Sequence, residues 1–191
     1  MRLHKPRIEP VKDSELSEGQ SELLGELNEA ARNLNLFRTT LHSVETMRGM
    51  LAWSNYLGSK KLNSLPWREK ELIILRTSFM CASGYEWSHH AYLGKSAGLE
   101  AAEISALRDA GPDHSWGPHD LALINMCDEL VLDRFVSDTT WAALAEFLDQ
   151  KTLMDAVYTA SHYGMVANFA NTFGVQIDKG VHLDDGLEKY Q

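Results

Sequence analysis

The segment from Trp67 to Met80 is the sequence feature that most constrains the fold. Its apolar residues do not keep to one side of a helix but surround most of it, which is typical of a helix buried on more than one side. They are Leu72, Ile73, Ile74, Leu75, Phe79 and Met80. Pro66 precedes the segment, where a proline suits the first turn of a helix. Other helices must therefore surround this one, and Glu71 and Arg76 are its polar exceptions.

The rest of the chain also shows helical periodicity, and no useful stretch alternates with the period of two that marks a strand. We expect helices over residues 17–33, 41–57, 67–80, 85–97, 99–110, 119–132, 138–149 and 152–173, with a break at 34–38. Thr39 or Thr40 is the expected cap of the second helix. The sequence predicts an all-α fold, a compact multi-helix domain.

Several helix ends carry recognisable signals. Ser17 followed by Gln20 fits a capping box, while Gly98 and Gly174 stand where a left-handed C-cap is favoured. At 191 residues the chain suits one domain. We expect an N-terminal arm at 1–16, an all-α domain at 17–178 and a polar C-terminal tail at 179–191 that docks loosely or is mobile.

Composition excludes several classes of protein. The net charge of −9 argues against a nucleic-acid partner, which needs clustered Lys and Arg. No apolar run approaches the ~20 residues that span a bilayer, and the N-terminus has no apolar signal region, so we expect no membrane association and a cytoplasmic location. Cys81 and Cys127 are too few for a disulfide framework, and we expect both thiols to be buried and inert.

A group of acid–base side chains lies between Arg68 and Gly98. Glu86 and His90 are four residues apart, so they share a helix face, with His89 on its flank, and Glu71 lies in the preceding helix. One interpretation is a surface Glu86–His90 pair, with Glu71 bound to Arg68 or Arg76. The alternative is an active site formed by Glu71, Glu86 and His90.

The residues alone favour the surface pair, but their resemblance to a known motif favours the active site. Glu71, then Ser83-x-x-Glu86-x-x-x-His90, resembles the core motif of the carboxymuconolactone decarboxylase and alkylhydroperoxidase D-like superfamily. Its peroxidase members have cysteines where Ser83 and Glu86 stand here. The form Tyr85-Glu86-Trp87-x-x-His90 is similar to a cysteine-free branch, and Asn171 to Val175 also resembles its members. The resemblance covers roughly residues 36–178 and implies the alkylhydroperoxidase D-like fold.

The departure from the peroxidase pattern narrows the implied chemistry. A peroxidatic cycle needs a thiolate and a resolving thiol, and neither Ser83 nor Glu86 supplies one. The resemblance then implies a cofactor-free enzyme of the decarboxylase type. It would transfer protons in decarboxylation, lactone or lyase-type chemistry on a small carboxylated or carbonyl compound, as in aromatic catabolism. Family members also form trimers or hexamers, so a homo-oligomer is expected.

We assign provisional roles within this site. His90 is the natural proton shuttle because its ordinary pKa of ~6.5 is closest to working pH. Glu71, in the most apolar surroundings, would be the neutral donor, and Glu86 would orient or deprotonate. The predicted substrate-binding residues are Ser83, Tyr85, His89 and His162, and Arg76 is a further candidate for stabilising developing charge.

Three alternatives remain open at this point. A metal site could use Glu86, His89, His90 and His162, but no His-Glu-x-x-His motif is present and the family resemblance implies no metal. A thiol-dependent, peroxidase-like protein could use Cys81. A non-catalytic binding protein could keep the same fold.

Overall fold

The computed structural model describes residues 3–109, 116–184 and 187. Its elements are η1 (Asp13–Glu15), α1 (Glu18–Gly25), α2 (Glu29–Arg32), α3 (Asn35–Thr40), α4 (Val44–Gly58), α5 (Trp67–Met80), α6 (Gly84–Ala97), α7 (Ala101–Asp109), α8 (Pro118–Leu132), α9 (Asp138–Ala145) and α10 (Gln150–Phe173). The described residues contain no strand. The predicted all-α fold is confirmed.

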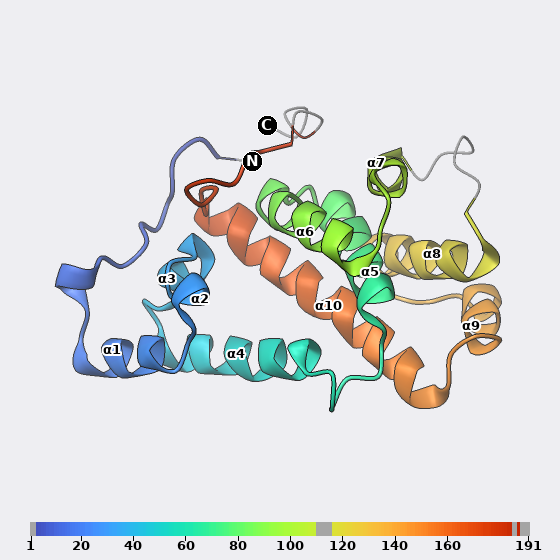
Figure 1. The fold of residues 1–191 in the computed structure, drawn as a ribbon, viewed down its shortest axis with the longest axis horizontal. Coiled ribbons are helices and arrows are strands. Elements are labelled where there is room, and N and C mark those ends of the chain that lie inside the picture. The colour runs from blue at the N-terminus through green and yellow to red at the C-terminus, as the bar shows by residue number, and fades with distance from the viewer. Residues whose placement is uncertain (1–2, 110–115, 185–186, 188–191) are drawn as a thin grey trace.

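Helix α5 lies at the centre of the molecule, as its apolar sequence predicts. It packs against α6, α7, α8 and α10, and Figure 1 shows these helices around it. Leu72, Ile73 and Leu75 are completely buried in the main core, together with Trp87 of α6. The burial of so much apolar surface fixes α5 and α6 side by side. The two helices that carry Glu71, Glu86 and His90 are therefore neighbours.

A second, smaller core joins the N-terminal helices to α4. Leu23 and Leu24 of α1 pack with Met47 and Met50 of α4. In Figure 1, α4 runs along one edge of the molecule, and α10 crosses the molecule toward α6. The space between α4, α5, α6 and α10 is where the candidate site lies.

The predicted helix ends are largely correct. Ser17 and Gln20 form the capping box of α1, and Gly98 and Gly174 adopt the left-handed conformation after α6 and α10. One difference is that residues 17–33 form two helices, because the Asn28 side chain accepts a hydrogen bond from Ala31 N–H and starts a new turn.

Two further boundaries were predicted wrongly. Residues 35–38 of the expected break are helical and belong to α3. The N-cap of α4 is Ser43 instead of Thr39 or Thr40, and its Oγ accepts a hydrogen bond from Thr46 N–H. The helix expected over 99–110 is α7, and Ala110 lies outside the described residues.

Both ends of the chain contact the helical body. In the arm, Arg7 N–H donates to the Phe173 carbonyl at 2.8 Å and Val11 is buried. In the tail, Trp87 Nε1–H donates to Asp184 at 3.1 Å, and Leu187 is only 2% exposed. These tail residues thus contact the helical body. Residues 185–186 and 188–191 lie outside the described part.

Helices α4 and α10 also present apolar side chains to solvent. We call this surface the α4–α10 face, and its exposed members are Trp53, Met154, Tyr158 and Met165. The rings of Trp53 and Tyr158 lie 5.2 Å apart. Within the described chain, no helix has both the length and the apolar character required to cross a membrane.

Candidate active site

Glu71 and His90 meet between α5 and α6. Glu71 Oε2 lies 2.7 Å from His90 Nδ1, the distance of a strong, charge-assisted hydrogen bond. The carboxylate comes from the second turn of α5 and the imidazole from the middle of α6. Glu71 is only 4% exposed, so this contact is shielded from water. The structure therefore brings together the two residues that the sequence placed 19 positions apart.

Glu86 completes the cluster from one turn earlier in α6. Its Oε2 lies 3.7 Å from His90 Nε2, on the opposite side of the ring from Glu71. Glu86 is 3% exposed, and its Oε1 is buried with no hydrogen-bond partner among the described residues. The imidazole thus stands between two buried carboxyl groups, one of which has an unused oxygen.

The alternative of a surface ion pair is wrong for these residues. Glu86 and His90 face the interior, and the two arginines offered as partners for Glu71 bind elsewhere. Arg68 pairs with Glu103 and Asp120, and Arg76 pairs with Asp128 while also donating to the Leu107 carbonyl. Arg76 is therefore committed to a structural network and does not reach the cluster.

Burial and charge shift the pKa values of the cluster. Burial alone lowers the pKa of His90, but the hydrogen bond to Glu71 and the charges of Glu71 and Glu86 outweigh it, so the net shift is upward. Burial raises the pKa of Glu86, which the neighbouring histidines only partly oppose. Both shifts are upward, so the charged form of His90 and the neutral form of Glu86 are each more favoured than in a free side chain.

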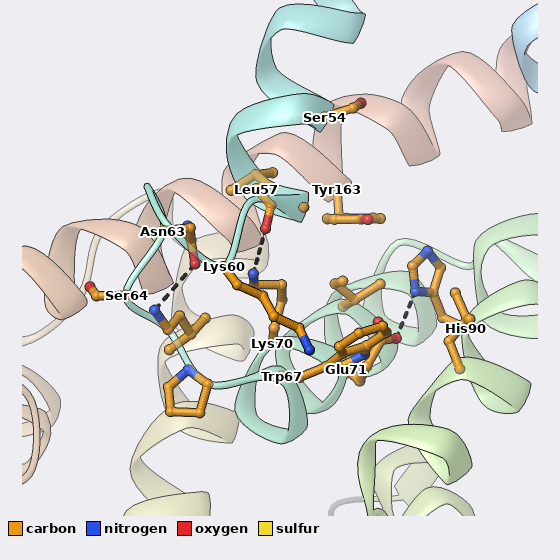
Figure 2. Close-up of a pocket in the computed structure, with 15 residues that line it drawn as sticks. Ser54, Leu57, Lys60, Asn63, Ser64, Trp67, Lys70, Glu71, His90 and Tyr163 are labelled. Atoms are coloured by element: carbon orange, nitrogen blue, oxygen red, sulfur yellow. Dashed lines mark hydrogen bonds and ion pairs between the residues drawn. The ribbon is translucent and has the colours of Figure 1, made fainter. Parts of the chain in front are cut away.

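Two cavities flank His90. The first, which we call the Lys70 cavity, has a volume of about 490 Å³. Figure 2 shows its lining, with the Glu71–His90 contact at one side. Its polar lining residues are Ser54, Lys60, Asn63, Ser64, Lys70, Glu71, His90 and Tyr163. A space of this size accommodates a small molecule.

The second space, which we call the Glu86 cavity, has a volume of about 210 Å³. It shares Ser54, His90, Leu93 and Tyr163 with the Lys70 cavity, so these side chains stand between the two spaces. The Tyr163 ring packs edge to face against the His90 imidazole, with 5.0 Å between the ring centroids. One His90 ring therefore reaches two cavities, with Glu71 lining the first and Glu86 the second.

Three of the predicted substrate-binding residues line the Glu86 cavity, namely Tyr85, His89 and His162. Tyr85 OH donates to Asp178 Oδ2 at 2.6 Å, and His89 Nε2 lies 3.0 Å from the same oxygen. Asp178 thereby holds both side chains in place. Burial lowers the pKa of His162 to about 4, so this imidazole is neutral near pH 7.

Ser83 lies outside both cavities. It is buried at the start of α6, where its Oγ accepts a hydrogen bond from Glu86 N–H and caps the helix. Ser83 therefore serves as the N-cap of the helix that carries Glu86. Contact with a substrate is not favoured by this position.

The alternatives with metal or thiol chemistry can be compared with the same geometry. Among the described residues, no three His, Cys, Asp or Glu side chains converge as a metal site would require. Cys81 lines a separate cavity of about 300 Å³ with Leu130 and Met165, away from His90. Cys127 is fully buried, which raises the pKa of its thiol to about 12.

Sequence reasoning left three cavity residues out of the predicted site. They are Lys70, Asn63 and Tyr163, none of which is among the predicted catalytic or substrate-binding residues. Their roles depend on α4, α5 and α10 meeting in space, and no local pattern in the sequence signals that meeting.

The fold and cluster define a class: an all-helical domain with a Glu–His–Glu cluster buried between two adjacent helices. Residues 45–123 match the model of the Carboxymuconolactone decarboxylase family. By this match and by its fold, the chain is similar to the carboxymuconolactone decarboxylase and alkylhydroperoxidase D-like superfamily. No curated protein sequence matches the chain. The narrower link to the cysteine-free branch stays a prediction.

Solved structures share the fold at low sequence identity. An uncharacterized peroxidase-related protein from Silicibacter sp. TM1040 is 14% identical, with coverage of 95% of this chain and 93% of that chain and a TM-score of 0.71. An uncharacterized peroxidase-related protein with an AhpD core from Ralstonia eutropha JMP134 is 17% identical, with coverage of 93% and 95% and a TM-score of 0.68. The debrominase Bmp8 in complex with 2,3,4-tribromopyrrole is 12% identical, with coverage of 92% and 94% and a TM-score of 0.71.

Proposed function

We propose that this protein is an acid–base enzyme that transfers protons to or from a small carboxylated or carbonyl compound. Decarboxylation and lactone or lyase-type chemistry, as in aromatic catabolism, fall within this class. The observation that carries the proposal is the buried Glu71–His90 contact of 2.7 Å, with Glu86 on the far side of the ring. Such a cluster beside a cavity is characteristic of groups that exchange protons with a substrate.

His90 is the proton donor in this proposal. Its Nδ1–H donates to Glu71, which fixes the tautomer and the orientation of the ring. Its Nε2–H points toward Glu86 and is the proton available to a substrate. The upward shift of the His90 pKa favours retention of this second proton. A carbanion or enolate left by bond cleavage would take that proton.

Glu86 is better placed than Glu71 to act as a neutral acid. This reverses the roles inferred from sequence, in which Glu71 was the neutral donor and Glu86 the residue that orients or deprotonates. Burial favours its protonated form, and Oε1 has no partner among the described residues. The gap of 3.7 Å between Glu86 Oε2 and His90 Nε2 leaves both groups free to contact one substrate oxygen. Two donors aimed at one oxygen stabilise the negative charge that develops on it.

The redox alternative would require Cys81 to work without this cluster. Cys81 lines neither cavity beside His90. Proton transfer is also compatible with the neutral Glu86, whereas a peroxidatic cycle needs a second thiol to resolve the first. We therefore propose acid–base chemistry without a thiol or a bound cofactor.

We also propose that the protein associates with itself through the α4–α10 face. Trp53 and Tyr158 expose apolar rings there, and large exposed apolar patches commonly mark protein–protein contacts. Trimers or hexamers of the superfamily are the forms expected from the family resemblance.

A panel of small carboxylated lactones and β-keto acids tests the catalytic proposal. Carbon dioxide release and deuterium uptake from D₂O into product would be followed by NMR. His90→Asn, Glu71→Gln and Glu86→Gln should each lower turnover by about 10²–10⁴-fold, the usual contribution of a general acid or base. Circular dichroism would confirm that each variant is folded. Wild-type turnover in all three variants would disprove the proposal.

A further inference from the structure

We propose that the Lys70 cavity selects organic carboxylates, and that Lys70, Lys60 and Asn63 bind the carboxylate at the side away from His90. This inference rests on the proposed function of the same site and names the substrate class and the residues that recognise it. It concerns a carboxylate used for binding, separate from the atoms that exchange protons at His90.

Lys70 is held at the cavity by the end of another helix. Its Nζ donates to the carbonyl of Leu57 in the last turn of α4, where the helix dipole favours a cation. An ammonium group has three donors, so two remain for a ligand. No carboxylate of the described chain lies within ion-pair distance of this nitrogen.

Lys60 adds a second cation to the same cavity. Its Nζ lies 5.2 Å from the centroid of the Trp67 ring, and within the described residues it has no carboxylate partner. Among the described residues, Glu71 is the only acidic side chain that lines the cavity, and it is already bound to His90. A protein with a net charge of −9 thus places two cations without carboxylate partners in one cavity.

Asn63 provides an independent indication of a ligand. It lines the cavity and is only 4% exposed. Its Oδ1 accepts a hydrogen bond from Leu65 N–H at 3.2 Å, but its Nδ2 is buried with no partner in the described residues. An unsatisfied buried donor is costly, and a carboxylate oxygen would satisfy it.

The start of α5 favours negative charge at the same place. Pro66 is the N-cap and lines the cavity, and no side chain caps the first turn. The first backbone N–H groups of a helix attract anions, and α5 has 14 residues that contribute to its dipole. This feature adds to the lysines and Asn63, which carry the argument.

The arrangement of the cavity suggests how a substrate would lie. In Figure 2, Lys60 and Lys70 lie on one side of the cavity and His90 lies on the other. Apolar side chains of Leu57, Ile74 and Leu93 line the space as well. A compound with a carboxylate at one end and an apolar body would therefore place its far end beside His90.

Isothermal titration calorimetry at pH 7 with benzoate tests the inference directly. Neutral benzamide has nearly the same shape and should bind at least about tenfold more weakly, because a charged hydrogen bond contributes that much or more. Lys70→Met should weaken benzoate binding by about tenfold to a hundredfold, and Lys70→Arg should retain most of it. Lys61→Met is the matched control, because Lys61 is exposed and lies outside the cavity.

Asn63→Asp provides a second variant that preserves side-chain shape. Its added negative charge should also weaken benzoate binding about tenfold or more. Equal affinity for benzoate and benzamide, or unchanged affinity in Lys70→Met, would overturn the inference. Inorganic phosphate binding more tightly than benzoate would overturn the choice of carboxylate. Binding is measured without turnover, so these failures are distinct from loss of the His90-dependent activity.

Discussion

Replacing Glu71 by glutamine should lower the pKa of His90, which tests the central contact of the site. Burial lowers the pKa of His90 in the wild type, and the hydrogen bond and charge of Glu71, with the charge of Glu86, more than reverse that effect. Glutamine keeps the shape of Glu71 but removes its charge. Burial would then dominate.

The expected change follows from the contact of 2.7 Å between two buried groups. A hydrogen bond to a charged group contributes about 1.5–3 kcal/mol. Glu71→Gln should therefore remove about 1.5–3 kcal/mol of the stabilisation of charged His90 and lower its pKa. Glu86→Gln should lower it less, because Glu86 lies 3.7 Å away and acts on His90 only through the fraction of Glu86 that is ionised.

The same change affects stability in a defined direction. The pKa of His90 is higher in the folded protein than its ordinary value of 6.5. Its contribution to stability is complete below pH 6.5 and is lost as the pH rises through the folded pKa. The wild type should therefore lose part of its stability advantage over Glu71→Gln across that interval. Urea unfolding of both proteins at several pH values would measure this.

NMR titration of ¹³C-labelled histidine provides the direct measurement. The Cε1 signal of His90, assigned with His90→Asn, should titrate highest in the wild type, lower in Glu86→Gln and lowest in Glu71→Gln. Glu69→Gln is the control, since Glu69 carries the same charge in the first turn of α5. An unchanged His90 pKa in Glu71→Gln would refute the role given to this contact.

Three further predictions concern the rest of the molecule. Gly174→Ala should lower the free energy of unfolding in urea by about 1–3 kcal/mol, because φ is +69° and a Cβ would lie 2.9 Å from the Lys5 carbonyl oxygen. Gly49→Ala is the control: a Cβ there has open space, so the variant should be as stable as the wild type or more stable by about 0.5–1 kcal/mol. Cys81→Ser should keep the turnover of the wild type in the substrate panel, and thiol-dependent peroxide consumption lost in this variant would favour the redox alternative. Sedimentation should show a wild-type oligomer that Trp53→Asp weakens, and a wild-type monomer at micromolar concentration would exclude the proposed contact.

The features predicted correctly from sequence are those that depend on nearby residues. The Ser17 capping box and the Gly174 C-cap each require only a few neighbouring positions. The break expected at 34–38 failed because this segment is ordered by distant contacts. Leu36 is buried there, and its N–H donates to Tyr85 OH at 3.4 Å. Tertiary packing thus overrode weak local preference.

The candidate site was likewise predicted in part from sequence, and the rest depends on distant contacts. The i, i+4 relation predicted that Glu86 and His90 share a face, and the family spacing brought in Glu71. The partners of the arginines were not predictable, because Asp120 and Asp128 reach Arg68 and Arg76 from α8. Because these aspartates pair with both arginines, Glu71 pairs with His90 instead.

Burial at the position of Glu86 bears on which chemical group this helical fold can carry there. By the family resemblance, Glu86 stands where peroxidase members have a cysteine. The position is completely enclosed, and enclosure raises the pKa of Glu86. A site that disfavours charge suits a neutral carboxylic acid, whereas a reactive thiolate at the same position would need a charged His90 beside it. Exchanging the residue at this position would then change the chemistry while the Glu71–His90 contact stays the same.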